Sequence, residues 1–183
     1  MALFVSRALL AGALLLGSAG SAWCAGSIEP LLRLAAQRNA IGDEVALSKW
    51  DSGKPVQDAA REAVVLTGVR EKAPEHGLDP DEAARFFGMQ IEANKLVQYQ
   101  LLNRWRLRGR APDGPRPDLP ALRKRLDQLQ SDMLDALEAS AAARKAPDCP
   151  ATTARAIKAY ARAHRLDRLH RMALIRSFGD FCR

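Results

Sequence analysis

The chain has 183 residues, enough for one domain with a buried core. Aromatic residues make up only 5% while alanine and leucine abound, which favours an all-helical bundle over a β-sandwich. The formal net charge of +7 suits an anionic partner, whether nucleic acid, a membrane surface or a small multi-anion. No basic run is interleaved with aromatic residues, so the pattern does not favour nucleic-acid binding.

The first 25 residues have the pattern of a secretory signal peptide. Arg7 supplies the positive charge, residues 8–16 form an apolar core, and small residues follow at 17–22. The apolar run is too short to span a bilayer comfortably, and no stop-transfer segment follows it. We therefore expect a periplasmic or secreted protein without a stable membrane anchor.

The cleavage site of this leader stays open between Ala22 and Ala25. Cys24 could indicate a lipoprotein, but the residues before it fit that type of cleavage site poorly. The mature domain is expected to comprise residues 26–183.

Export would place two further cysteines, Cys149 and Cys182, in an oxidising compartment, where two cysteines suit one disulfide. In the loop-entropy model such a bridge stabilises the fold by about 3–4 kcal/mol. The alternative is a pair of free buried thiols.

The first long amphipathic helix is expected over residues 28–50, followed by a helix stop at Asp51-Ser52-Gly53. Arg38 and Lys49 are separated by about three helical turns and project to nearly the same side. Ile41 and Val45 lie between them at helical spacing, on the side that should face a core. A cation on such a side needs an anionic partner unless it reaches water by snorkelling, which is the ordinary alternative.

A second helix is expected to open at Pro55 and to run to about residue 72. Asp58, Arg61 and Glu62 are related as i, i+3 and i+4, so they should be neighbours on one face. A surface ion pair would account for them without any function.

The third helix is expected from an Asp79 N-cap, with Pro80 at its first position, to about Leu107. One stripe of this helix is apolar except for two amides, Asn94 and Gln98. The stripe comprises Phe87, Ile91, Asn94, Gln98, Leu101 and Trp105. Buried amides need partners, and interhelical hydrogen bonds would satisfy them without a ligand.

In the remaining chain we expect a glycine- and proline-rich connection and three more helices, which brings the expected total to about six helices. These are a connection at 108–117, a helix from Asp118 to the alanines at 141–143, and shorter helices at 151–164 and 166–181. His164 and His170 lie among basic residues without a ligand set at metal spacing, so no metal site is expected.

The order and spacing of the polar residues on the first three helices resemble those of the all-helical chorismate mutases. The resemblance is carried by Arg38, Lys49, Lys54 to Glu62, His76 to Pro80, and Ile91 to Gln98. It implies an all-α, single-domain fold and an enzyme that converts chorismate to prephenate without metal or cofactor.

The rest of the chain is similar to the exported, or gamma, subclass of that family. Those members have a leader, a C-terminal helical extension with a disulfide, and an active site completed within one chain. The resemblance implies site helices at 26–107 and an extension at 118–183. It places Arg123 at the position of the arginine that completes the active site, with Lys124 and Arg125 as alternative candidates.

Roles for the site residues follow from the same resemblance. Arg38 and Arg123 would clamp the two substrate carboxylates, with help from Asn94. Lys49 and Gln98 would donate to the ether oxygen, where negative charge grows in the transition state. Some relatives carry Glu at the position of Gln98 and Ser or Thr at that of Asn94.

The resemblance also implies roles for three residues at the start of the second helix. Glu62 would accept a hydrogen bond from the ring hydroxyl. Arg61 would lie near the substrate or orient Glu62, and Asp58 would support the site.

Two other functions compete with this interpretation. An isochorismate-pyruvate lyase would use a similar pocket on the same scaffold, although those lyases resemble the short cytoplasmic subclass. A non-catalytic basic protein would instead expose its cations to an acidic partner. Relatives also suggest a possible homodimer, which a one-chain site would not require.

Overall fold

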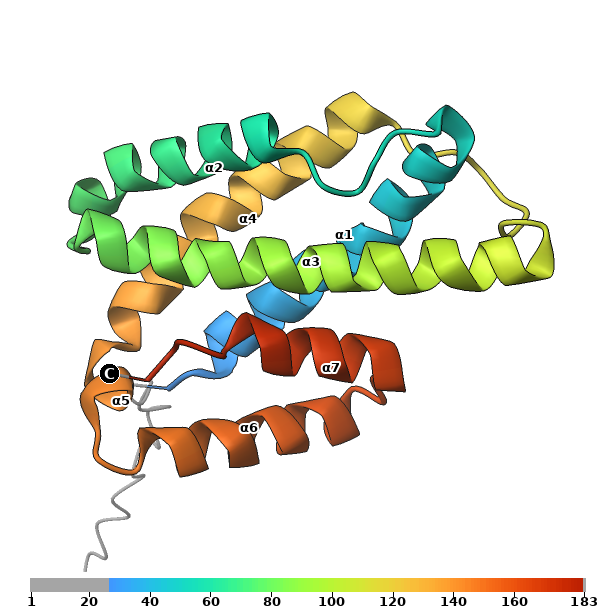
Figure 1. Cartoon of the computed structure of the whole chain (residues 1–183). Helices are drawn as coiled ribbons and strands as arrows, with labels where there is room; N and C mark the ends of the chain where they lie inside the picture. The colour runs from blue at the N-terminus through green and yellow to red at the C-terminus, as the bar shows by residue number, and fades with distance from the viewer. Residues whose placement is uncertain (1–26, 183) are drawn as a thin grey trace, which may run out of the picture.

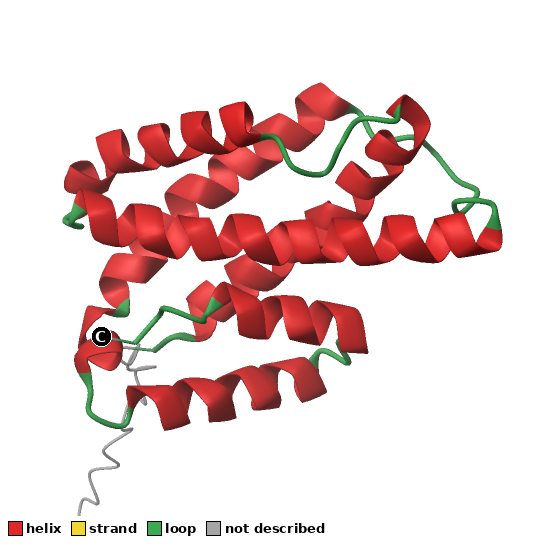
Figure 2. Cartoon of the chain, viewed as in Figure 1, coloured by secondary structure: helices red, strands yellow, loops and turns green. Residues whose placement is uncertain are grey.

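The computed structural model describes residues 27–182, so the expected leader lies outside the described residues. The described chain is entirely helical, with no strand, which confirms the all-α prediction (Figure 2). Its α-helices are α1 Glu29–Ser52, α2 Ala59–Lys72, α3 Pro80–Arg108, α4 Leu119–Ala139, α5 Ala141–Lys145, α6 Cys149–Ala163 and α7 Arg168–Ser177. A 3₁₀ turn, Ala73–His76, joins α2 to α3. Within this range no helix is both long and apolar enough to cross a membrane.

The ends of α1 and α3 lie where the residue chemistry predicts them. Gly53 takes a positive φ of 68° and its N–H bonds the Lys49 carbonyl, which terminates α1. The Asp79 carboxylate accepts from the Glu82 N–H at 2.8 Å, and Pro80 starts α3 without a lost donor.

Three helix predictions were wrong at their boundaries. The second helix begins at Ala59 rather than near Pro55, because Asp58 takes a non-helical φ of −139° and caps the helix. The fourth helix ends at Ala139 and does not reach the alanines at 141–143. Ser140 turns out of helical geometry there and its hydroxyl donates to the Leu137 carbonyl at 2.7 Å.

The last helix is also shorter than predicted. It begins at Arg168, because the Asp167 carboxylate caps it by accepting from the His170 N–H at 2.8 Å. It ends at Ser177, and residues 178–182 continue outside helical structure. The separate α5 brings the described α-helices to seven instead of about six.

Helices α1 and α3 cross at the centre of the bundle and pack against each other (Figure 1). Helices α2 and α4 lie on one side of this pair, where α2 packs on α3 and α4 packs on α1. The α6–α7 hairpin lies on the other side, with α7 against α3 and α1. Two apolar clusters fill the bundle, one around Phe87 and Leu134 and the other around Val97 and Trp105.

The C-terminal region is fastened to the bundle by a covalent bond and by buried hydrogen bonds. Cys149 and Cys182 form a disulfide with an S–S distance of 2.02 Å, as predicted. Asn39 Nδ2 donates to Ser177 Oγ at 3.0 Å, and Gln90 Nε2 donates to the Ser177 carbonyl at 2.8 Å. Helix α7 is therefore tied by polar contacts to both central helices.

A glycine in α1 sets how closely α1 and α3 approach. A Cβ on Gly42 would lie 3.1 Å from Val97 Cβ and 3.2 Å from Asn94 Nδ2. Contacts this short require neighbouring atoms to shift, and both neighbours are held in the centre of α3. Because Gly42 has no side chain, Asn94 can pack directly against α1.

We expect Gly42→Ala to lower the free energy of unfolding by about 1–2 kcal/mol, because the clash outweighs the gain in helix propensity. It should also lower kcat/KM, because Asn94 is displaced. The controls are Gly68→Ala and Gly88→Ala, where an added Cβ would meet nothing within 4 Å. They should stabilise the fold by about 0.5–1 kcal/mol in urea unfolding. A stabilised Gly42→Ala would contradict the close approach.

Candidate active site

A pocket of about 330 Å³ opens between α1, α2, α3 and α4, a size typical of sites for small molecules. All the site residues predicted from the sequence line it, namely Arg38, Lys49, Asp58, Arg61, Glu62, Asn94, Gln98 and Arg123. Its apolar wall consists of Val45, Val56, Val65, Ile91, Leu122 and Leu126. Four helices thus bring cations, amides and carboxylates to one apolar-walled cavity.

Arg38 places a guanidinium at the buried end of this pocket. Its side chain is only 7% exposed, and its Nε has no hydrogen-bond partner among residues 27–182. Burial lowers the pKa of Arg38 to about 10, and the charge of Asp127 opposes that shift only in part. The guanidinium carbon lies 6.0 Å from the centre of the Phe87 ring. A buried cation with a free donor has the chemistry to bind an anion.

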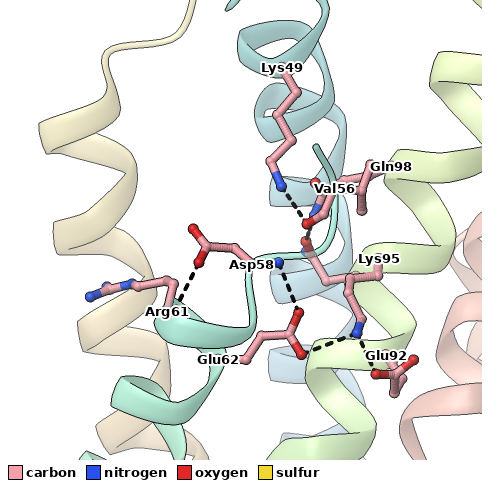
Figure 3. Close-up of polar contacts among 9 residues, drawn as sticks. Lys49, Val56, Asp58, Arg61, Glu62, Glu92, Lys95 and Gln98 are labelled. Carbon is pink, nitrogen blue, oxygen red and sulfur yellow. Dashed lines mark hydrogen bonds and ion pairs between the residues drawn. The ribbon is translucent and has the colours of Figure 1, made fainter. Parts of the chain in front are cut away.

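Lys49 approaches the pocket from the last turn of α1. Its Nζ donates to the Val56 carbonyl at 2.6 Å (Figure 3). Burial lowers the pKa of Lys49, while Asp58 and Glu62 raise it in part and Lys95 lowers it further. The ammonium is therefore partly desolvated and held where three other charged groups meet.

The two amides of α3 are bonded to each other and to α1. Asn94 Nδ2 donates to the Arg38 carbonyl at 2.8 Å, and Gln98 Nε2 donates to Asn94 Oδ1 at 2.7 Å. The expected interhelical bond is therefore present for Asn94. Gln98 is bonded within α3, and its buried Oε1 has no partner among the described residues.

The start of α2 is organised by backbone capping. Asp58 Oδ1 accepts from the Arg61 N–H at 3.0 Å, and the Asp58 N–H donates to Glu62 Oε1 at 3.4 Å. The Arg61 side chain points away from Glu62 (Figure 3). The surface ion pair considered for these residues is not formed in the described structure. Glu62 instead pairs with Lys95, at 3.2 Å.

Helix α4 places Arg123 at the pocket, whereas the two alternative candidates, Lys124 and Arg125, lie outside it. Arg123 lines the cavity beside the buried Leu122. Arg125 is engaged outside the pocket, where its Nη1 lies 2.8 Å from Glu44 Oε1. Lys124 is exposed and is not among the lining residues. Arg123 is thus the cation of this group that reaches the cavity.

Sequence reasoning missed three polar lining residues, Lys95, Asp127 and Gln130. Lys95 had a signal, because Ile91, Lys95 and Gln98 are related as i, i+4 and i+7 on one helical stripe. For the other two, the sequence shows only polar residues on an amphipathic helix.

The histidines lie outside the pocket. His164 stacks on Tyr160 with ring centres 4.0 Å apart. His170 pairs with Asp43 at 3.3 Å and with Asp167 at 3.0 Å. Within residues 27–182, no group of three or more histidine, cysteine or acidic side chains is arranged to hold a metal.

Comparisons with known proteins agree on one family. Residues 29–99 match the family model described as chorismate mutase type II. The chain is 32% identical over 159 residues to the secreted chorismate mutase of Mycolicibacterium smegmatis, covering 87% of this chain and 88% of the relative. It is 31% identical over 153 residues to the secreted chorismate mutase of Mycobacterium tuberculosis, covering 83% and 76%.

A solved structure extends this similarity over nearly the whole described chain. The crystal structure of chorismate mutase from Burkholderia phymatum superposes with a TM-score of 0.83 at 44% sequence identity. The match covers 85% of this chain and 96% of that structure. With the identity and coverage of the secreted relatives, these matches establish that the chain belongs to the chorismate mutase type II family.

Proposed function

We propose that the protein catalyses the rearrangement of chorismate to prephenate in the pocket between α1 and α4. The observation that carries this proposal is the convergence of Arg38, Lys49 and Arg123 on one cavity, with Arg38 buried and its Nε unused. Chorismate is a dianion, and the pocket supplies cations for two carboxylates. Membership of the chorismate mutase family supports the same reaction.

Binding of the carboxylates would select the reactive shape of the substrate. Chorismate is flexible and must fold into a compact, chair-like conformer before its bonds can exchange. Arg38 would hold one carboxylate from α1 and Arg123 the other from α4, with Asn94 close to Arg38. When both carboxylates of the substrate are held in place, its rare reactive conformer becomes the conformer that the protein binds.

Donors at the ether oxygen would lower the barrier itself. As the C–O bond breaks ahead of C–C bond formation, negative charge grows on that oxygen. Lys49 and Gln98 would donate to it, so these contacts strengthen in the transition state. In the structure the Lys49 ammonium donates to the Val56 carbonyl. The ether oxygen of the substrate would compete with that carbonyl for the ammonium. A million-fold acceleration requires about 8 kcal/mol, and one such donor supplies about 3–4 kcal/mol.

The α2 end of the pocket would recognise the ring hydroxyl. Glu62 is an acceptor, and the proposed role for it is to take a hydrogen bond from that hydroxyl. Asp58 would act as a supporting residue, since its carboxylate caps α2 through the Arg61 N–H. Arg61 would lie near the substrate, since it lines the pocket and its side chain points away from Glu62.

We also propose that the protein is an exported member of the family, with residues 1–25 as a cleaved leader and 26–183 as the mature domain. The Cys149–Cys182 disulfide and the secreted relatives support export to the periplasm or the medium. Because Arg123 of the same chain lines the pocket, a homodimer would not be required for activity.

Lys49→Ala should lower kcat by about a hundredfold to a thousandfold, because it removes a transition-state donor. The measurement is the loss of chorismate absorbance on the leaderless protein, with the circular-dichroism spectrum remaining helical. Lys158→Ala is the matched control, since Lys158 is exposed on α6 away from the pocket. A near-normal kcat in Lys49→Ala would refute its role. Salicylate and pyruvate as products would identify a lyase instead.

The amide of Gln98 predicts a particular pH profile. An amide donates at any pH, so Gln98 should not make kcat/KM rise as the pH is lowered from neutral. It should fall at alkaline pH, because Lys49 must remain protonated and its pKa is lowered by burial. Gln98→Glu should lose activity as the pH rises through the carboxyl pKa, because only the protonated acid donates. An optimum near pH 5 in the parent protein that vanishes in Gln98→Ala would contradict this account.

A further inference from the structure

A lysine without an assigned role lies at the edge of the pocket, between two carboxylates. Lys95 Nζ is 3.2 Å from Glu62 Oε2 on α2 and 2.6 Å from Glu92 Oε1 on its own helix (Figure 3). Its side chain is only 12% exposed, whereas those of Glu62 and Glu92 are 24% and 42% exposed. The ion pair with Glu62 therefore joins α3 to α2 in a partly desolvated setting, where charge pairing is stronger than at a surface.

This contact completes a two-sided grip on Glu62. One carboxylate oxygen, Oε1, accepts from the Asp58 N–H at 3.4 Å, and the other, Oε2, accepts from Lys95. The neighbouring Arg61 does not serve this purpose, since its side chain points the other way. A long glutamate side chain held at both oxygens keeps one orientation in the pocket. Without these contacts, substrate binding would have to order the side chain, at a cost in binding free energy.

We propose that Lys95 is a positioning residue that holds the Glu62 carboxylate in the orientation needed to accept a hydrogen bond from the ring hydroxyl of the substrate. The proposal rests on the proposed function, because it assigns to Glu62 the role of hydroxyl acceptor. Lys95 acts through Glu62 and does not clamp a substrate carboxylate, since its ammonium already serves two protein carboxylates.

The charge balance around Lys95 agrees with this role. Burial lowers the pKa of Lys95, and the hydrogen bonds with Glu92 and Glu62 more than offset that effect, so its pKa is raised and the ammonium persists. Glu92 neutralises part of this charge. The Lys95 cation lowers the pKa of Lys49.

A double-mutant cycle between Lys95 and Glu62 tests the proposal. Lys95→Met keeps the apolar stem and removes the ammonium, so it should lower kcat/KM for chorismate about tenfold through misplacement of Glu62. In a Glu62→Gln background, the same change should cost less than about twofold, because the group that Lys95 positions is already gone. Lys95→Arg should restore most of the lost activity, since it can pair with the same carboxylate.

The matched control is Arg104→Met, which removes a positive charge from an exposed position of α3 outside the pocket. Its kcat/KM should be unchanged, and both variants should keep a helical circular-dichroism spectrum at the assay temperature. Independent, additive effects of Lys95→Met and Glu62→Gln would overturn the proposal, as would full activity of Lys95→Met. In either case Lys49→Ala would still report on the proposed function, so the two failures are distinguishable.

Discussion

The guanidinium of Arg38 lies inside a helical bundle, and its Nε has no hydrogen-bond partner among residues 27–182. The proposed site is built around that unfilled interaction. Removing a cation from water is unfavourable unless hydrogen bonds and an opposite charge replace the lost hydration. Among the described residues, Asp127 is the acid whose charge acts on Arg38, and it is exposed. A bound carboxylate would complete the pairing. In the proposed function, the fold would thus be prepared for a dianion before one arrives.

Several structural features keep this cation where a ligand can reach it. Gly42 allows α3 to approach α1 closely enough for Asn94 to bond the Arg38 carbonyl. On the other side of α1, the neighbouring Asn39 bonds Ser177 of α7. Helix α1 is therefore braced on both sides of Arg38, by α3 and by α7. The disulfide-linked C-terminal region contributes to the site in this indirect way, through the position of α1.

Local chemistry was sufficient to predict much of the fold. Gly53 ends a helix and Asp79 with Pro80 starts one, because each choice depends on a few neighbouring residues. The start of α2 was misplaced, because Pro55 is also a good first helical residue. In the structure Asp58 caps the helix, and Lys49 donates to the Val56 carbonyl in the segment before it. Nor does the alanine-rich sequence around Ser140 reveal the break between α4 and α5.

The site residues show the same division between local and tertiary information. Helical spacing placed Arg38 and Lys49 on one side of α1, and the family resemblance supplied partners on the other helices. Spacing could not separate Arg123 from Arg125, because that choice depends on where Glu44 lies across the bundle. Lys95 was overlooked beside Asn94, since a lysine in a helix usually serves solvation and its partner Glu62 comes from another helix.

In the proposed mechanism, cations from α1 and α4 close on the two carboxylates of one small ligand. The most direct test is a crystal structure with a bicyclic dicarboxylate that mimics the chair-like transition state. The account predicts one carboxylate on Arg38, the other on Arg123, and the ether oxygen between Lys49 and Gln98. An analogue bound elsewhere, or bound in this pocket with Arg38 still unengaged, would contradict it.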